Sequence, residues 1–200
     1  MSPYHHGNLR AELLERAWEV VDRDGLDGLS LRGLSRDIGV SHGASARHFR
    51  DRQSLLDALA RMGFERLNRA LSETAGTASF AERLRAAGHA YVAFAVAHPR
   101  ILDLMYDAKH HPSASAELVE LSHTAMRDLV AMITAAQEAG EARPGDPRQL
   151  ALIVFANVHG VATLATGDLL DGVPWPEAAA LTIDFAWQGI AAVSARATGG

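Results

Sequence analysis

The sequence predicts an all-α fold, in which an N-terminal three-helix domain with a helix-turn-helix motif joins a C-terminal helical bundle. Apolar residues recur at helical spacing along most of the 200 residues. Alanine, the strongest helix former, is abundant, whereas β-branched residues are modest in number. No segment shows the alternating pattern of a half-buried strand, and we find no internal repeat or low-complexity stretch.

Composition and charge limit the classes of protein. The chain has no cysteine, which excludes disulfides, thiolate catalysis and cysteine-ligated metals. No apolar run approaches the roughly 20 residues that span a bilayer, and the N-terminus lacks an apolar signal core, so we expect a cytoplasmic protein. Residues 1–70 hold 11 basic and 10 acidic side chains, and residues 71–200 hold 8 and 14. If nucleic acid is bound, we therefore expect the N-terminal part to bind it.

The first expected helix covers residues 8–24. Asn8 is a suitable N-cap, and Gly25 a suitable end because glycine adopts the left-handed conformation at low cost. The apolar face of this helix consists of Leu9, Leu13, Ala17, Val20 and Val21. A turn over residues 25–30 follows, because this segment contains two glycines and an aspartate. Ser30 can cap the next helix.

A helix-turn-helix motif is expected over residues 30–48. Three apolar residues at helical spacing make one face of a short helix, and Gly39 follows where such a helix commonly ends. Ser41 can cap a second helix over residues 42–48. Two helices around a tight turn that contains glycine are the pattern of many DNA-binding proteins.

The second helix of this motif contains mostly small residues, which allow a backbone to approach a surface closely. Residues 30–52 hold five arginines and two aspartates, a local charge of +3 in a chain whose net charge is −5. Such a positive region is expected for contact with phosphate. Helix–glycine–helix corners with solvated charges also occur in proteins that bind no DNA, so the spacing alone leaves both interpretations open.

Six more helices are expected after the motif, separated by segments rich in glycine, proline and serine. Their ranges are 52–74, 79–98, 99–108, 114–139, 146–166 and 176–193. The last two are the most apolar, and they are apolar on more than one face. A helix with this much apolar surface is central in its bundle or lies at an interface.

Residues 4–56 resemble the N-terminal domain of the tetracycline-repressor (TetR) family of transcriptional regulators. The resemblance rests on the Leu-Ser-Leu-Arg segment from Leu29, the Ile-Gly-Val-Ser turn that ends at Ser41, and His48-Phe49 followed by a basic residue and Leu-Leu. Family members usually carry a tyrosine that contacts the DNA backbone where this chain has Ala46. The preceding position, Ser45 here, is often apolar or proline.

This resemblance implies that the third helix enters the major groove and that an N-terminal arm meets phosphate. We expect Ser41, His42 and Arg47 to contact base edges or phosphate. The full set of expected DNA-contacting residues is Tyr4, His5, His6, Arg32, Ser41, His42, Ala44, Ala46, Arg47, His48 and Arg52. Two such domains in a dimer would read a palindromic operator.

Residues 155–170 resemble the Trp-x-x-x-His-Gly signature of one TetR C-terminal subfamily, with Phe155 in place of tryptophan. The resemblance implies a DNA-binding domain over 1–56 and a ligand-binding and dimerisation domain over 57–200. In the family the last two helices pair with their copies, so we expect Val161 and Leu164 in a homodimer interface. Candidates for an effector pocket, which would serve equally as plain core, are Tyr91, Phe94, Met105, Tyr106, Met126, Phe155 and His159.

The combined expectation is a transcriptional repressor that a small-molecule effector releases from DNA, with no catalytic residues, metal or cofactor. One alternative is a TetR-like helical dimer that has lost sequence-specific DNA reading, in line with Ala46. A second alternative is a metal-dependent helical-bundle enzyme. Glu120 and His123 have the spacing of a di-iron site, but that site needs a second such pair and two further glutamates.

Overall fold

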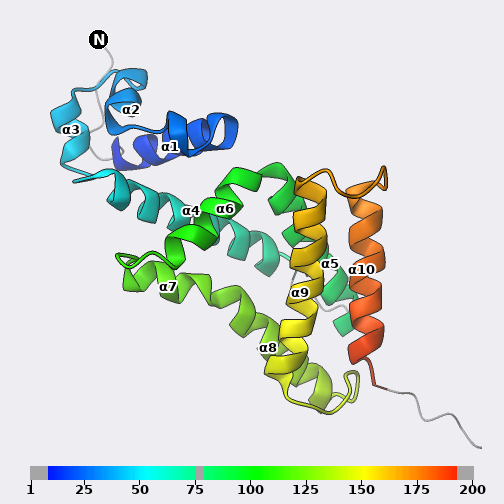
Figure 1. The fold of residues 1–200 in the computed structure, drawn as a ribbon. Helices are drawn as coiled ribbons and strands as arrows, with labels where there is room; N and C mark the ends of the chain where they lie inside the picture. The colour runs from blue at the N-terminus through cyan, green and yellow to red at the C-terminus, as the bar shows by residue number, and fades with distance from the viewer. Residues whose placement is uncertain (1–8, 75–78, 193–200) are drawn as a thin grey trace, which may run out of the picture. The chain divides into compact units, whose positions relative to one another are not determined.

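A computed structural model describes residues 9–74 and 79–192, and these residues form ten α-helices and one short 3-10 helix (Figure 1). The all-α prediction is confirmed, since the described β-structure is a single bridge between Ala142 and Ala191. The elements are α1 (Leu9–Asp24), η1 (Leu26–Gly28), α2 (Leu31–Asp37), α3 (His42–Ala46), α4 (Arg52–Ser72), α5 (Phe80–Ala97), α6 (Pro99–Lys109), α7 (Ala116–Ser122), α8 (Thr124–Glu138), α9 (Pro147–Thr166) and α10 (Trp175–Ile190).

The helices divide into two compact units. Of the described residues, the first unit contains 9–66 and 98–122, and the second contains 67–74, 79–97 and 123–192. The chain therefore passes from the first unit to the second and back before it completes the second. These units are defined by which residues pack together. The boundary at residue 56 between a DNA-binding and a ligand-binding domain remains a prediction.

In the first unit, α1 supplies the central apolar face and α6 caps its end. Leu13, Ala17 and Val21 of α1 are fully buried, in agreement with the expected stripe. The last carbonyls of a helix lack partners within it, and the Arg100 guanidinium of α6 donates to two of them, those of residues 22 and 23, at 2.8 and 2.7 Å. His98 Nδ1 lies 2.9 Å from the Asp22 carboxylate beside them. The start of α6 is thus fixed to the end of α1.

In the second unit, α5, α8, α9 and α10 pack around one core, and Figure 1 shows α9 and α10 side by side in opposite directions. Asp146 caps α9 through the amide of Arg148, as expected from the sequence. The loop before α9 ties two other helix ends: a Glu141 carboxylate oxygen accepts from the Phe80 amide that begins α5, at 3.1 Å. Arg143 Nε donates to the Gly189 carbonyl near the end of α10, at 2.9 Å.

One predicted helix is wrong. The sequence suggested a continuous helix over residues 114–139, whereas the structure has α7 and α8 with a break at His123. The Ser122 hydroxyl donates to the Val119 carbonyl, and the His123 carbonyl accepts the first bond of α8 from the Arg127 amide. No glycine or proline marks this break. The competition comes from a serine side chain that bonds the local backbone.

The apolar character of α9 also corrects an expectation. This 20-residue helix contains an 18-residue window with a mean hydropathy of 1.5, so it is long and apolar enough to cross a membrane by length and composition alone. Core helices of soluble proteins pass the same test. Here α9 packs against α5, α8 and α10.

Gly88 of α5 lies against the side chain of Ile183 on α10. A Cβ at this position would lie 2.6 Å from Cδ1 and 2.8 Å from Cγ1 of Ile183, a buried residue of α10. We predict that Gly88→Ala destabilises the fold by about 1–3 kcal/mol, because overpacking outweighs the gain in helix propensity of about 1 kcal/mol. Thermal unfolding of the variant measures the loss.

The matched control is Ile183→Ala, which removes both the Cδ1 and the Cγ1 atoms that the new methyl group would meet. In this background Gly88→Ala should cost clearly less than in the wild type. An equal cost in both backgrounds would show that the contact with Ile183 is not the cause.

Candidate functional site

The predicted helix-turn-helix motif is present in α2 and α3. The Ser30 hydroxyl accepts from the Gly33 amide at 3.0 Å and caps α2. Gly39 has a φ of 73°, and the Val40 amide reaches back to the Ser35 carbonyl at 2.9 Å, which closes α2 with a Schellman motif. The turn therefore uses the glycine that the sequence singled out.

The second helix of the motif, α3, is shorter than predicted. Its cap is the expected one, since the Ser41 hydroxyl accepts from the Ala44 amide at 3.2 Å. The helix ends at Ala46 and not at His48, because the amides of His48 and Phe49 both bond the Ser45 carbonyl. Phe49 is buried and anchors the segment that follows. The Arg10 guanidinium lies 5.3 Å from the centre of its ring.

Internal partners neutralise the acidic residues of this region and leave several arginines free. Asp37 accepts from Arg16 of α1 at 2.9 and 3.0 Å. Asp51 accepts from the Ser54 amide at 2.7 Å as the cap of α4, which holds the pKa of its carboxyl below the ordinary range, and it also pairs with Arg50. Three exposed arginines make no hydrogen bond or ion pair with any described residue: Arg32, Arg36 and Arg47.

Most of the residues expected to contact DNA lie on the surface of this motif. Those that are exposed are Arg32, Ser41, His42, Ala46, Arg47, His48 and Arg52. Ala44 is half-buried. Arg52 also donates to the Leu26 carbonyl at 2.8 Å, so it holds η1 as well as presenting charge. The arm residues Tyr4, His5 and His6 lie outside the described residues.

Three of the expected effector residues meet in the second unit. The Tyr91 hydroxyl of α5 lies 2.9 Å from Nδ1 of His159 on α9. The rings of His159 and Phe155 stack, with centroids 5.4 Å apart and an interplanar angle of 21°. Tyr91 meets Phe155 edge to face at 6.0 Å. Phe94 and Met126 are half-buried in the same unit.

The two remaining candidates belong to the first unit. Met105 is fully buried, and its sulfur and Cγ lie against Gly63 of α4. Tyr106 meets Phe64 edge to face at 6.1 Å, and the Lys109 ammonium lies 4.6 Å from the centre of the Tyr106 ring. Partial burial lowers the pKa of this lysine. Both candidates therefore have packing roles that the sequence did not separate from ligand binding.

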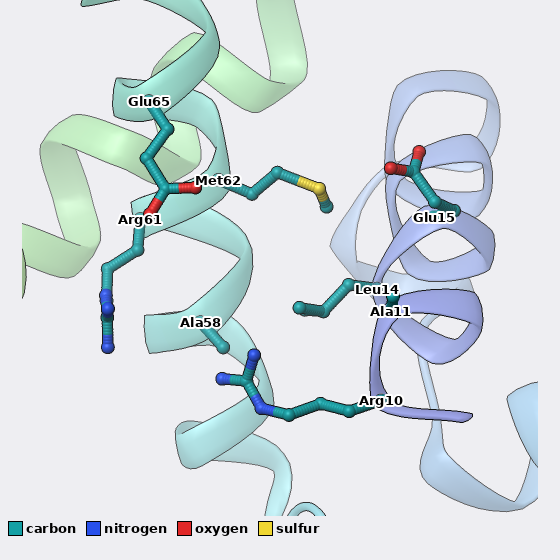
Figure 2. A pocket seen from close by; sticks show the side chains of 8 residues that line it. All are labelled: Arg10, Ala11, Leu14, Glu15, Ala58, Arg61, Met62 and Glu65. Atoms are coloured by element: carbon teal, nitrogen blue, oxygen red, sulfur yellow. The ribbon is translucent and has the colours of Figure 1, made fainter. Parts of the chain in front are cut away.

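A hollow between α1 and α4 has a volume of about 130 Å³, and Figure 2 shows Met62 and Leu14 pointing toward one another across it. Its wall consists of Arg10, Ala11, Leu14, Glu15, Ala58, Arg61, Met62 and Glu65. Sites for small molecules commonly measure roughly 300–1,000 Å³, so this hollow is smaller than such a site.

The described residues contain no group of three or more histidine and acidic side chains that could hold a metal ion.

Sequence reasoning missed a buried contact that joins α2 to α3. Ser35 and Ser45 are buried, and their hydroxyl oxygens lie 2.8 Å apart. Ser45 drew notice only as a departure from the family pattern. Helical spacing places Ser35 beside the apolar face of its helix, but α3 has no apolar stripe that would mark Ser45 as buried, and spacing cannot show that the two side chains meet.

The second half of the chain matches a known family. Residues 84–186, just over half of the chain, match the family described as Tetracyclin repressor-like, C-terminal domain. A curated relative, the HTH-type transcriptional repressor Rv1474c of Mycobacterium tuberculosis (strain ATCC 25618 / H37Rv), is 37% identical over 67 residues. These residues are 34% of this chain and 36% of that protein, so the chain matches about a third of the relative's length.

Solved structures agree with this match. The structure of a protein with unknown function from Rhodococcus sp. RHA1 has a TM-score of 0.89 and 49% identity, covering 96% of this chain and 100% of that one. A TetR family transcription regulator from Marinobacter aquaeolei VT8 has a TM-score of 0.72 and 17% identity, covering 92% and 96%. The latter similarity shows the fold alone. From the family match and the fold, we conclude that the chain belongs to the tetracycline-repressor (TetR) family of transcriptional regulators and is not an enzyme.

Proposed function

We propose that the protein is a cytoplasmic, homodimeric repressor that reads a palindromic operator with α3 and leaves it when a small molecule binds. The observation that carries the DNA-binding part is a set of exposed arginines on α2 and beside α3 that have no partner among the residues the structure describes: Arg32, Arg36 and Arg47. Cations that no internal carboxylate satisfies are available to phosphates and base edges.

The surface of α3 supports close approach to DNA. A Cβ added at Gly43 would meet nothing within 4 Å, so open space lies in front of the helix there. At about 100° per residue, Arg47 lies on the same side of the helix as Gly43. We assign base contact to Arg47 and His42 and to the cap Ser41. Arg32, His48, Arg52 and the arm Tyr4-His5-His6 are assigned to phosphate, with Ala44 and Ala46 in close contact.

The dimer proposal rests on exposed apolar side chains of α9, α10 and the loop between them. They are Leu152, Ile153, Leu164, Leu169, Val173, Leu181 and Phe185. On α10 the exposed pair Leu181 and Phe185 is one turn apart and forms a stripe. Contiguous apolar surface of this kind marks an interaction site.

We place the effector site at the cluster of Tyr91, Phe155 and His159. An aromatic wall with a polar group is the chemistry that a small-molecule pocket in a helical bundle requires. Phe94 and Met126 of the same unit complete this proposed site, and Met105 and Tyr106 remain candidates on α6. The cluster also supports assignment to the Trp-His-Gly subfamily, since Phe155 and His159 hold its first two positions and Gly160 the third.

Arg47→Ala tests base reading. We predict that it weakens binding to a palindromic duplex from upstream of the protein's own gene by about 1–3 kcal/mol, with little change on random duplex. Fluorescence anisotropy at two salt concentrations measures both affinities. The matched control is Arg127→Ala, which removes an exposed arginine of α8 and should leave both affinities unchanged.

Equal loss on the two duplexes would assign Arg47 to phosphate only. Wild-type protein that binds operator and random DNA equally would instead support the alternative function. In that case the chain is a TetR-like dimer that has lost sequence-specific reading, consistent with alanine at position 46.

A charge in the apolar stripe tests the dimer. Phe185 and Leu181 are 72% and 64% exposed, so an aspartate at either position is tolerated by the monomer. We predict that Phe185→Asp and Leu181→Asp each sediment as monomers at concentrations where the wild type is dimeric. The control Ala131→Asp adds the same charge to the exposed face of α8 and should remain dimeric. A dimer in all three would place the interface elsewhere.

The sequence-based choice of Val161 for this test is unsuitable, because Val161 is only 5% exposed within one protomer. An aspartate there would damage the core and dissociate the dimer for an unrelated reason. Leu164, which the sequence named with it, is exposed and stays a valid position.

Tyr91→Phe tests how the effector cluster is held in the free protein. Tyr91 is buried and its hydroxyl bonds His159 Nδ1, so we predict that removal of the hydroxyl lowers the free energy of unfolding by about 1 kcal/mol. Chemical denaturation measures the loss. A protein of unchanged stability would show that the bond is not a structural one, which would strengthen the case that these groups are kept for a ligand.

A further inference from the structure

The interface between α2 and α3 contains an unusual buried contact between two hydroxyl groups. Ser35 of α2 is 3% exposed and Ser45 of α3 is 0% exposed. Among residues 9–74 and 79–192, these two serines are the buried polar residues. Their oxygen atoms lie 2.8 Å apart, a normal hydrogen-bond distance between hydroxyls.

The direction of this bond follows from the other partner of Ser35. The Ser35 hydroxyl also lies 2.7 Å from the Leu31 carbonyl, one turn back in α2. A carbonyl can only accept, and a hydroxyl has one proton, so Ser35 donates to Leu31. Ser45 must therefore donate to Ser35. The result is a short chain of bonds from the side chain of α3 to the backbone of α2.

Both serines also close their own helices through the backbone. The Ser35 carbonyl accepts from the Val40 amide at the end of α2, and the Ser45 carbonyl accepts from the His48 and Phe49 amides at the end of α3. The side-chain bond thus links the two residues that set where α2 and α3 stop. A large rotation of α3 about its axis would break it.

Within α3 itself, Ser45 supplies the buried side chain that can fix that rotation. Ser45 is the one buried residue of the helix, and its other members are histidine, glycine and alanine. Apolar packing is non-directional, and α3 has no large apolar side chain to pack. At about 100° per residue, Gly43 and Arg47 point away from Ser45. The orientation of Ser45 consequently decides the orientation of the side that faces outward.

We propose that Ser35 and Ser45 are positioning residues for DNA reading, and that their hydrogen bond sets the rotation of α3 on α2. This inference rests on the proposed role of α3 as the reading helix. Neither serine touches DNA in this proposal. They act through the placement of Arg47 and His42, so they affect discrimination between sequences more than affinity for phosphate.

The bond direction gives two different single variants. Ser45→Ala removes the donor but leaves the Ser35 proton on the Leu31 carbonyl, so no buried polar group loses its partner. We expect nearly unchanged thermal stability, unchanged affinity for random duplex, and about a tenfold loss of preference for the operator, as for one hydrogen bond. Ser35→Ala removes the acceptor and leaves the Ser45 hydroxyl buried without a partner. It should lower the melting temperature as well as the preference.

The double variant Ser35→Ala, Ser45→Ala provides the matched control. It leaves no unpaired hydroxyl, so its stability should recover relative to Ser35→Ala while its operator preference stays low. A Ser45→Ala protein with the full preference of the wild type would overturn the proposal and reduce the pair to packing. So would a loss in Ser45→Ala that is equal on operator and random duplex.

A second measurement keeps this test separate from the proposed function. Hydrogen exchange at the His48 and Phe49 amides, which bond the Ser45 carbonyl, should speed up in Ser45→Ala because α3 is no longer held to α2. If the wild type fails to prefer the operator, the proposed function fails, and exchange still decides the positioning role. Unchanged exchange in Ser45→Ala would contradict that role whatever the DNA result.

Discussion

A five-residue helix cannot hold its own shape, and this constraint governs the first unit. Isolated helices shorter than about 12–15 residues are marginal in water, so α3 exists because its surroundings impose it. Those surroundings are the Schellman turn at Gly39, the cap at Ser41 and the anchor at Phe49. The remaining degree of freedom is rotation of α3, and the Ser35–Ser45 bond restricts it.

The same unit also separates charges in a way that favours an anion. Arg16 pairs with Asp37, and the cap residue Asp51 accepts from a local backbone amide. The side chains of Arg32, Arg36 and Arg47 have no such partner among residues 9–74 and 79–192. The two aspartates of the region therefore offset little of the positive potential outside. The second unit differs, because it exposes apolar side chains on α9 and α10. One unit thus leaves cations exposed, and the other leaves an apolar face exposed.

The sequence predicted the parts of the fold that local chemistry decides. The end of α2 followed from Gly39, and the starts of α3 and α9 followed from Ser41 and Asp146, because caps and left-handed turns act within a few residues. Long-range contacts were invisible to this reasoning. The clearest cases are the Arg100 guanidinium on the last carbonyls of α1 and the Ser35–Ser45 bond.

Burial within a predicted helix was equally out of reach of periodicity. Val161 and Leu164 are both apolar and three residues apart, yet the first is buried within its own chain and the second is exposed. A helix that is apolar on two faces gives no sign of which face meets its own chain. The break at His123 escaped for a related reason, since serine is a weak signal whose effect depends on whether its hydroxyl turns back to the backbone.

The two departures from the TetR pattern, Ser45 and Ala46, are adjacent and have opposite surroundings. Ala46 is exposed and removes a long side chain from the outer surface, while Ser45 is fully buried and adds a directional bond to the inner one. With an alanine at 46 and small residues at 43 and 44, few groups on α3 can read a base edge. When few groups carry the specificity, each of them depends more strongly on the orientation of the helix. We infer that a chain with this sparse outer surface benefits from a hydrogen bond, and not loose apolar packing, beneath it.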